Sequence, residues 1–141
     1  MQVNAFDHVA IPIAQPEAML RFYAALGFTV PAFADWVASG AKHFAVQFGD
    51  QKINMHGPAL WQDPAFTLRG HSARPGCGDF CFVWPGTLDA LRERLQAAGA
   101  VVEVGPSPRL GARNGGQWGT SHYTRDPDGN LLEFMVYEPQ A

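Results

Sequence analysis

A turn followed by an apolar strand places one carboxylate where a polar side chain needs a partner. Residues 126–130 read Asp-Pro-Asp-Gly-Asn, which is typical of a tight turn because proline fixes φ and glycine accepts a positive φ. Residues 131–137 are almost wholly apolar except for Glu133. If the strand face that carries Glu133 is buried, its carboxylate needs a cation or hydrogen-bond donors. A metal ion is one such partner, and a glutamate on the solvent face of an edge strand is the alternative.

Three further side chains of metal-binding types lie in or beside apolar segments. His8 lies in a short apolar segment near the start, His56 ends an alternating segment, and Asp79 opens another apolar segment. Imidazole and carboxylate groups are common ligands of first-row transition metals, which can polarise a carbonyl or activate oxygen. Each residue also has an ordinary interpretation: His8 as a packed histidine, His56 as a loop-edge residue, and Asp79 as a cap or turn residue.

The elements that must position these residues occur twice in the same order. The first half is predicted to contain a strand at 6–13, a helix at 16–27, and strands at 28–33, 42–48 and 51–56. A long connection at 57–78 follows. The second half is predicted to contain a strand at 79–84, a helix at 87–99, a strand at 101–104, a turn-rich stretch at 105–119, and strands at 121–124 and 130–137. The pattern therefore predicts an α+β fold of two tandem βαβββ modules.

Composition limits the class of protein. The chain has 141 residues, of which 47% are hydrophobic and 16% charged, and its net charge is -3. It carries no basic stripe, so we expect no nucleic-acid partner. No apolar run approaches the roughly 20 residues that span a bilayer, and the start lacks a secretory pattern. We therefore expect a cytoplasmic protein without membrane association, in which Cys77 and Cys81 are reduced thiols. Both are interpreted as packing residues, and exposure is the alternative for Cys77, which lies near a loop.

Three segments make the chain similar to the vicinal oxygen chelate superfamily, the glyoxalase, bleomycin-resistance and extradiol-dioxygenase group. They read Asp-His-Val-Ala-Ile at 7–11, Arg-Phe-Tyr-Ala-Ala-Leu-Gly-Phe at 21–28, and Arg-Asp-Pro-Asp-Gly-Asn-Leu-Leu-Glu at 125–133. The segments at 52–56 and 105–109 further resemble a glyoxalase-domain-containing subgroup. The resemblance implies one domain that curls around a central cavity. Its expected parts are module one at about 4–57, a linker at about 58–77 and module two at about 78–138.

The same resemblance implies a metal site and a small-molecule substrate. His8 matches the family's first-strand ligand and Glu133 its last-strand ligand. Asp79 stands where the family usually has His or Gln, and His56 stands near a glutamate of glyoxalase I. The expected metal ligands are thus His8, His56, Asp79 and Glu133, and Glu133 and Tyr123 are the candidate catalytic residues.

The implied activity is that of a metal-dependent lyase, isomerase or dioxygenase. It would use a divalent ion (Zn, Ni, Fe or Mn) and a small oxygenated substrate that chelates the ion, and the protein would form a homodimer. The alternative is a metal-free protein of the bleomycin-resistance type that sequesters a small aromatic ligand. Four tryptophans, Trp36, Trp61, Trp84 and Trp118, and ten phenylalanines are available to line its groove.

Overall fold

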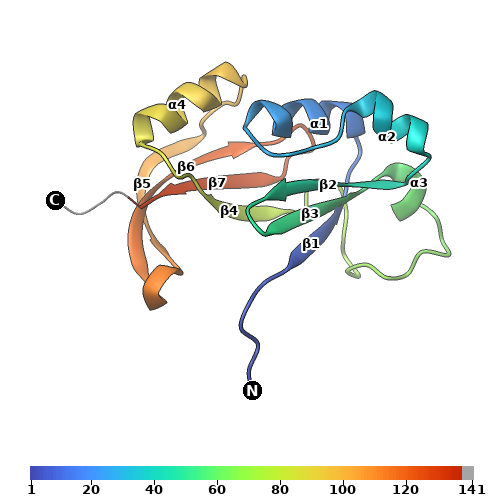
Figure 1. The fold of residues 1–141 in the computed structure, drawn as a ribbon, viewed down its shortest axis with the longest axis horizontal. Coiled ribbons are helices and arrows are strands. Elements are labelled where there is room, and N and C mark those ends of the chain that lie inside the picture. The colour runs from blue at the N-terminus through green and yellow to red at the C-terminus, as the bar shows by residue number, and fades with distance from the viewer. Residues whose placement is uncertain (138–141) are drawn as a thin grey trace. The chain divides into compact units, whose positions relative to one another are not determined.

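The computed structural model describes residues 1–137 and divides into two compact units, Met1–Cys77 and a second unit that starts at Gly78 (Figure 1). Helix and strand alternate in both units, and the predicted α+β class is confirmed. The predicted end of the second module at 138 lies outside the described residues. No helix among the described residues is long and apolar enough to cross a membrane.

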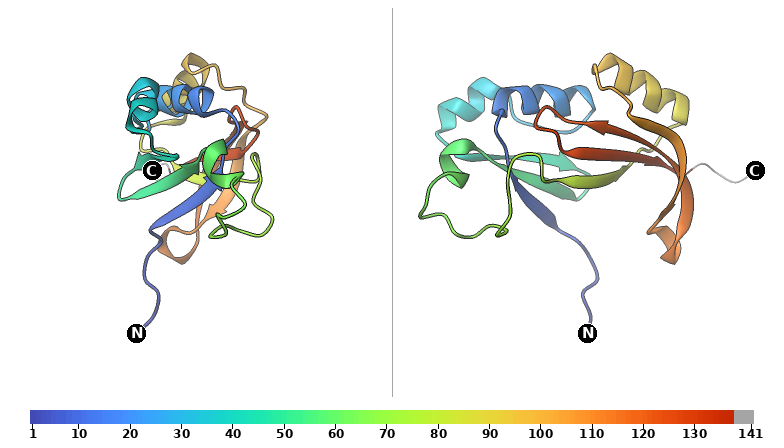
Figure 2. Two further views of the ribbon diagram at one scale, coloured as in Figure 1. Left: turned by 90° about the vertical axis from the view of Figure 1, so that its right-hand side faces the viewer. Right: turned by 180° about the vertical axis from the view of Figure 1, so that it is seen from behind.

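The first unit is a three-stranded sheet with helices. Its elements are β1 (His8–Pro12), α1 (Pro16–Ala25), α2 (Phe33–Ser39), β2 (His43–Phe48), β3 (Gln51–His56) and α3 (Pro58–Trp61). The strand order is β1-β3-β2, with β1 parallel and β2 antiparallel to β3. Proline at the end of β1 is tolerated because β1 is an edge strand. After α3 the chain runs to Gly78 without a further helix or strand (Figure 2).

One face of this sheet is apolar and buried, and the other carries the candidate site residues. Because strand side chains alternate, the register puts one set of residues of the three strands on the apolar face. They are Ile11 of β1, Ile53 and Met55 of β3, and Phe44 and Val46 of β2, each at most 4% exposed. Helix α1 contributes Met19, Leu20 and Tyr23 to the same core. His8 and His56 therefore lie on the opposite face.

The second unit is a four-stranded sheet with one long helix. Its elements are β4 (Asp79–Val83), α4 (Leu88–Ala97), β5 (Val104–Gly111), the short 3-10 helix η1 (Arg113–Gly115), β6 (Gln117–Arg125) and β7 (Leu131–Val136). The strand order is β4-β7-β6-β5. The Thr87 side chain accepts a hydrogen bond from the Ala90 backbone N–H at 3.1 Å and thereby caps α4.

Alternation again divides the sheet of the second unit into two faces. Leu132, Phe134 and Val136 of β7 are at most 3% exposed and share a face with the buried Phe82 of β4. Helix α4 is buried through Leu91 and Leu95, and we assign this apolar face to it. Glu133 lies between these β7 residues in sequence, so its side chain belongs to the other face.

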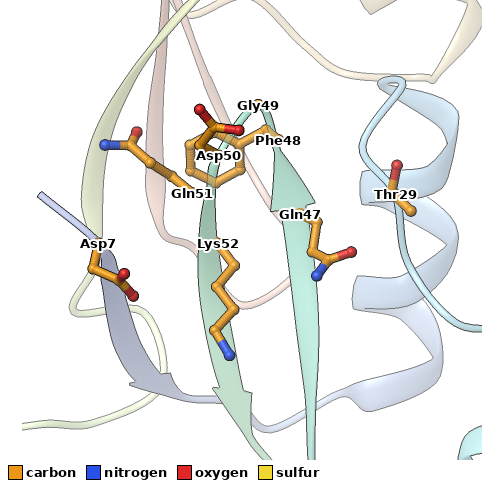
Figure 3. Close-up of a pocket in the computed structure, with 8 residues that line it drawn as sticks. All are labelled: Asp7, Thr29, Gln47, Phe48, Gly49, Asp50, Gln51 and Lys52. Atoms are coloured by element: carbon orange, nitrogen blue, oxygen red, sulfur yellow. The ribbon is translucent and has the colours of Figure 1, made fainter.

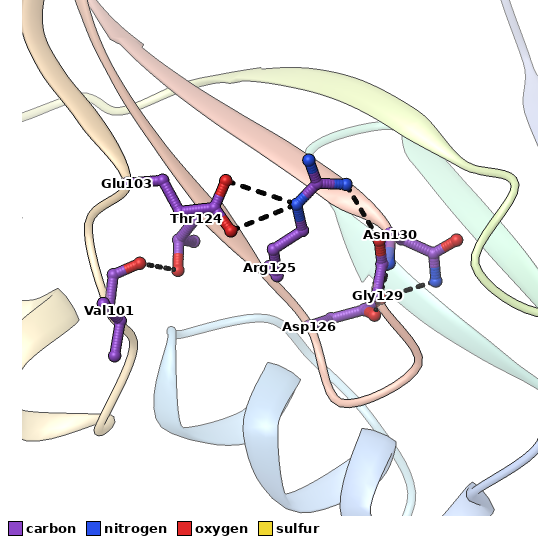
Figure 4. A network of polar contacts seen from close by, with 7 residues as sticks. All are labelled: Val101, Glu103, Thr124, Arg125, Asp126, Gly129 and Asn130. Atoms are coloured by element: carbon purple, nitrogen blue, oxygen red, sulfur yellow. Dashed lines mark hydrogen bonds and ion pairs between the residues drawn. The ribbon is translucent and has the colours of Figure 1, made fainter.

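The Asp126–Asn130 turn is held by buried polar groups (Figure 4). One carboxylate oxygen of Asp126 accepts from the backbone N–H groups of Asp128 and Asn130, each at 3.0 Å. The other accepts from the Asn130 side chain at 2.7 Å. Asn130 Oδ1 in turn accepts from the Gly78 N–H at 2.8 Å, at the start of β4. The turn thus joins the entry of β7 to the entry of β4.

The prediction of a strand at 28–33 is wrong. Only Thr29 pairs, through an isolated bridge to Gln47, and α2 begins at Phe33. Pro31 has no N–H for a sheet ladder, so a strand cannot continue through it. Gly40 ends α2 in the left-handed region with φ of 70°. The bridge lies beside β2 in the first unit, just as β5 lies beside β6 in the second unit.

The predicted turn-rich stretch at 105–119 is also wrong. Most of it belongs to the long β5–β6 hairpin, which is joined by η1. Gly105, Pro106, Pro108 and Gly111 fall in the edge strand β5, where a proline without an N–H is tolerated. The other glycines of this stretch lie in or next to η1 and in β6. A register shift between Val104 and Ser107 takes up the irregular part of the strand.

Candidate functional site

Glu133 is held in place on the face of the second sheet opposite α4. It lies in the middle of β7 and is half-buried. The register sets Cys81 of β4 on one side of it and Tyr123 of β6 on the other. The fully buried Ser121 donates its hydroxyl to Glu133 Oε2 at 2.6 Å. One carboxylate oxygen is therefore fixed, and the side chains of Tyr123 and Cys81 also hydrogen-bond to this carboxylate.

Tyr123 lies next to this carboxylate and is oriented by Arg109 of β5. Arg109 Nε donates to the Tyr123 hydroxyl oxygen at 2.9 Å, and its guanidinium lies 5.4 Å from the ring centroid. A second bond, from Arg109 to Ser107 Oγ at 2.6 Å, holds the guanidinium. Burial and then Glu133 raise the pKa of Tyr123, and Arg109 opposes the rise. The phenol is thus protonated at neutral pH and can act as a hydrogen-bond donor.

Cys81 lies on the same face and is not part of a core. Both Cys81 and Cys77 are exposed, so the prediction that they are packing residues is wrong, and the exposure given as the alternative for Cys77 is what the structure shows. Partial desolvation, followed by the carboxylates of Glu133 and Asp79, raises the pKa of Cys81 to about 12. The thiol is therefore protonated at neutral pH and is a poor nucleophile.

Asp79 is the first residue of β4 and is exposed. It pairs with Leu131, two residues before the Cys81–Glu133 pair. Two residues along a strand correspond to about 7 Å. The structure therefore places Asp79 and Glu133 on one face of one sheet.

His8 is the first residue of β1 and lies on the corresponding face of the first sheet. Its Nδ1 is 2.5 Å from Asp7 Oδ1, and its side chain is 45% exposed. The residue opposite it on β3 is Lys52. A shallow hollow of about 360 Å³ opens beside this pair and is lined by Asp7, Lys52 and the β2–β3 hairpin (Figure 3). The imidazole is thus accessible and oriented by a carboxylate, as metal-binding histidines commonly are.

Strand register reveals a position that sequence reasoning missed. His8 and Asp79 each open the first strand of their unit. Asp79 pairs with Leu131, two residues before Glu133, and His8 pairs with Lys52, two residues before Asn54. Asn54 therefore corresponds to Glu133 in the duplicated unit. Its Oδ1 is buried and has no hydrogen-bond partner within the described chain. The alternating segment at 52–56 held the signal, because Asn54 is the one polar residue at its centre.

His56 lies at the other end of this sheet face. It pairs with Pro12, four residues beyond the His8–Lys52 pair, which corresponds to about 13 Å along the strands. Its ring lies 6.3 Å from that of His43 and 5.3 Å from that of Phe66. Burial, then His43 and Arg69, lower the pKa of His56, so the imidazole is neutral at pH 7.

A second hollow, of about 320 Å³, opens beside His56. Its lining includes Pro12, His56, Trp61, Leu68, Arg69 and Ala73. The Trp61 indole donates to the Ile13 carbonyl at 2.9 Å, which fixes the segment after β3 against the end of β1. The long connection between the modules thus builds one wall of this hollow.

Within each unit, the described residues bring together no group of three or more His, Cys, Asp or Glu side chains that could hold a metal. The register instead groups the candidate positions in pairs, His8 with Asn54 and Asp79 with Glu133.

His122 lies on the apolar face of the second sheet and not beside Glu133. It is 2% exposed, and its Nδ1 has no hydrogen-bond partner within the described residues. Burial and then Arg92 of α4 lower the pKa of His122. Its folded pKa therefore lies below the value of about 6.5 that holds in the unfolded chain.

We expect the protein to lose stability as the pH falls below about 6.5, because the unfolded chain then binds the proton more readily than the folded one. Urea unfolding at pH 7.5 and 5.0 measures the loss. It should be smaller in His122→Gln than in the wild type, with His56 supplying part of the remainder. The exposed His71→Gln serves as the control and should keep the wild-type loss. An equal loss in His122→Gln and His71→Gln would contradict the assignment.

Comparison with known proteins identifies the family. A model described as the Glyoxalase/Bleomycin resistance protein/Dioxygenase superfamily matches residues 5–134. The virulence protein STM3117 of Salmonella typhimurium is 34% identical over 139 residues, which cover 97% of this chain and 87% of that protein. The glyoxalase domain-containing protein RDO1 of Mycosarcoma maydis is 33% identical over 138 residues, which cover 98% of this chain and 71% of that protein.

A solved structure shows the same fold over the whole length. The integron cassette protein VCH_CASS1 of V. cholerae has a TM-score of 0.79 and 32% sequence identity, and the match covers 98% of each chain. The resemblance carried by the His8, helix α1 and Asp126–Asn130 segments is therefore confirmed. The chain belongs to the glyoxalase/bleomycin resistance protein/dioxygenase superfamily.

Proposed function

We propose that this protein is a metal-dependent enzyme of its superfamily that acts on a small oxygenated substrate. The observation that carries the proposal is the environment of Glu133. Ser121 holds this carboxylate at 2.6 Å on the face opposite α4, and the protonated Tyr123 lies beside it. A fixed carboxylate next to a phenol that can donate a proton is an arrangement suited to chemistry on a bound substrate.

The donor atoms available suit a divalent transition metal. His8 offers an imidazole that Asp7 orients, and Glu133 offers a carboxylate that Ser121 orients. Asn54 adds a buried amide oxygen without a partner in the described chain. Nitrogen and oxygen donors of this kind bind Zn, Ni, Fe and Mn. We propose His8 and Glu133 as ligands, with Asp79 or His56 as candidates to complete the set.

When bound, such an ion would polarise a substrate with neighbouring oxygens or bring it together with oxygen. The chain's own residues would orient the substrate and move protons. Arg109 donates to the Tyr123 oxygen, so the phenol hydrogen is directed toward an acceptor on this face. Tyr123, which is hydrogen-bonded to Glu133, can therefore supply a proton or hydrogen bond, and the Glu133 carboxylate can accept one.

We further propose that the two units act as one domain and that the protein is a cytoplasmic homodimer. The family assignment across residues 5–134 supports the single domain, because one family model matches both units. Nickel or zinc in the site would favour lyase or isomerase chemistry, whereas iron or manganese would favour dioxygenase chemistry.

Metal content tests the proposal. Chelator-treated protein is reloaded with nickel, zinc, manganese or anaerobic ferrous iron, and the bound metal is measured by mass spectrometry. The wild type should hold about one ion per chain, as single-metal enzymes do. His8→Ala and Glu133→Ala should each lose it, and parallel measurements on Asp79→Ala and His56→Ala identify the remaining ligand.

Matched controls separate ligand loss from general damage. His71→Ala and Glu103→Ala remove an exposed imidazole and an exposed carboxylate and should keep the ion. Wild-type protein that binds none of the four metals would overturn the proposal. The superfamily alternative, a metal-free protein that sequesters a small aromatic ligand, would then be favoured.

A further inference from the structure

The hollow beside His56 is positively charged and has no acidic side chain in its lining. We call it the Arg69 pocket, with Pro12, His56, Trp61, Leu68, Arg69 and Ala73 among its residues. Arg69 and His56 are the chargeable groups of this lining, and His43 lies behind His56 at a ring distance of 6.3 Å. No carboxylate pairs with Arg69 in the described part of the chain. A cation without a counter-ion in a hollow is suited to an anionic ligand.

The guanidinium of Arg69 is fixed before any ligand arrives. One terminal nitrogen donates to the Trp61 carbonyl at 2.5 Å and the other to the Ala73 carbonyl at 2.7 Å. The guanidinium also lies 5.8 Å from the Trp61 ring centroid. A guanidinium has five N–H donors in a rigid fork, so these two bonds leave donors for a planar anion. Because the side chain is already ordered, binding a carboxylate costs little further conformational entropy.

The rest of the lining is apolar and small. Pro12 is buried, and Trp61 and Leu68 supply an aromatic and an aliphatic surface. The volume of about 320 Å³ is at the lower end of the range for small-molecule sites, roughly 300–1,000 Å³. This size admits a single ring or a short aliphatic chain. The combination of one fixed cation and an apolar wall selects a small monocarboxylic acid over a phosphate-rich ligand.

The pocket also lies on the sheet face that carries His8. Pro12 and His56 are paired in the register, on the same face as the His8–Lys52 pair and four residues further along. The distance along the strands is about 13 Å. A ligand anchored in the pocket would therefore extend along this face in the direction of His8.

We propose that the Arg69 pocket binds the carboxylate of a small organic acid whose apolar body packs on Trp61, Pro12 and Leu68. The inference deepens the proposed function, and rests on it, in that the acid would be the substrate or part of it. The connection at 57–78 is then a binding element, because it supplies Trp61, Leu68 and Arg69 to the end of the first sheet.

Benzoate and its neutral analogue benzamide serve as probes. Each is titrated into metal-free full-length protein, and the indole N–H signal of Trp61 is followed by NMR after assignment with Trp61→Phe. We expect benzoate to bind at least tenfold more tightly than benzamide. Arg69→Gln should weaken benzoate binding about tenfold, the loss that corresponds to about 1.4 kcal/mol, and should leave benzamide binding unchanged.

Arg69→Gln also breaks the bonds of Arg69 to the Trp61 and Ala73 carbonyls, so a second variant tests the pocket charge while keeping those bonds. Leu68 is 86% exposed, so Leu68→Glu places a negative charge at the pocket mouth without touching those bonds. It should weaken benzoate binding several-fold, whereas Leu68→Gln should not. Arg74→Gln, which removes an exposed charge of the same connection, is the control for net charge and should bind benzoate like the wild type.

The outcomes separate this inference from the metal proposal. The titration uses metal-free protein, so its result does not depend on whether the metal site is filled. Equal affinity for benzoate and benzamide, or wild-type benzoate affinity in Leu68→Glu, would overturn the carboxylate assignment whatever the metal content. If the wild type binds no metal but binds benzoate selectively, the proposed function is overturned and the carboxylate assignment of the Arg69 pocket is kept.

Discussion

Replacing Asn130 with alanine is expected to lower the free energy of unfolding by about 3 kcal/mol. The side chain is fully buried and bonds in two directions, to the Asp126 carboxylate at 2.7 Å and to the Gly78 N–H at 2.8 Å. Its removal takes one hydrogen bond from the buried Asp126 carboxylate and one from the Gly78 N–H. The loss of a buried hydrogen-bond partner costs about 1–3 kcal/mol per group. Urea unfolding followed by circular dichroism measures the change.

The exposed Asn114 provides a matched control. Its side chain donates only to Gln117, at 3.0 Å, and its φ is 54°. Glycine accepts that φ, so Asn114→Gly should change the free energy of unfolding by less than about 0.5 kcal/mol. A loss in Asn130→Ala as small as that of the control would show that the turn does not join β4 to β7 in solution. A side chain at position 78 could not replace the lost contact, because a Cβ added to Gly78 would lie 2.6 Å from the Phe80 ring.

Replacing Ser121 with alanine is expected to weaken metal binding about 10–100-fold while the capacity stays at one ion per chain. The Ser121 hydroxyl donates to Glu133 Oε2 at 2.6 Å and is fully buried. Loss of a hydrogen bond that orients a metal ligand typically costs 10–100-fold in metal affinity. Competition with a chromophoric chelator measures the dissociation constant of the wild type and of the variant. Ser121 acts through Glu133, so it is a positioning residue.

Ser107 is the control for this experiment because it is a serine on the same sheet face. Its Oγ accepts from Arg109 at 2.6 Å, and it has no bond to Glu133. Ser107→Ala should therefore bind the metal with wild-type affinity. If Ser121→Ala and Ser107→Ala weaken binding equally, the effect is not transmitted through Glu133. If Ser121→Ala lowers the number of ions bound per chain instead of the affinity, the substitution has destroyed the metal site and has not merely weakened it.

Local chemistry made several elements predictable from the sequence. Proline and glycine at the ends of the segment at 16–27 and the apolar spacing between them predicted α1, because these signals act within a few turns of one helix. Asp126 and Asn130 predicted the turn for the same reason, since most of its bonds are between neighbours in sequence. The duplicated order of elements predicted the α+β class, and the segments at 7–11, 21–28 and 125–133 carried the resemblance to the superfamily.

Where tertiary context outweighs local preference, sequence reasoning failed. Phe33–Ser39 forms a helix, although its first residue was predicted to end a strand. Val104–Gly111 forms a strand despite its two glycines and two prolines. An edge strand tolerates residues that a central strand would exclude. The residues alone do not reveal which strand will lie at an edge. The thiol of Cys81 was misplaced because its exposure depends on which elements cover its sheet face.

The sequence by itself determined the turn chemistry, the helices α1 and α4, the duplicated fold and the identity of His8 and Glu133 as candidate ligands. The tertiary structure alone decided that Ser121, Tyr123 and Cys81 surround Glu133, and that Asn54 takes the corresponding position in the first unit. The physical reason is strand register. It is fixed by the packing of many side chains on the buried face, and one residue of slip would move every side chain to the other face. Such pairings join residues that are far apart in the chain, and no local pattern encodes them.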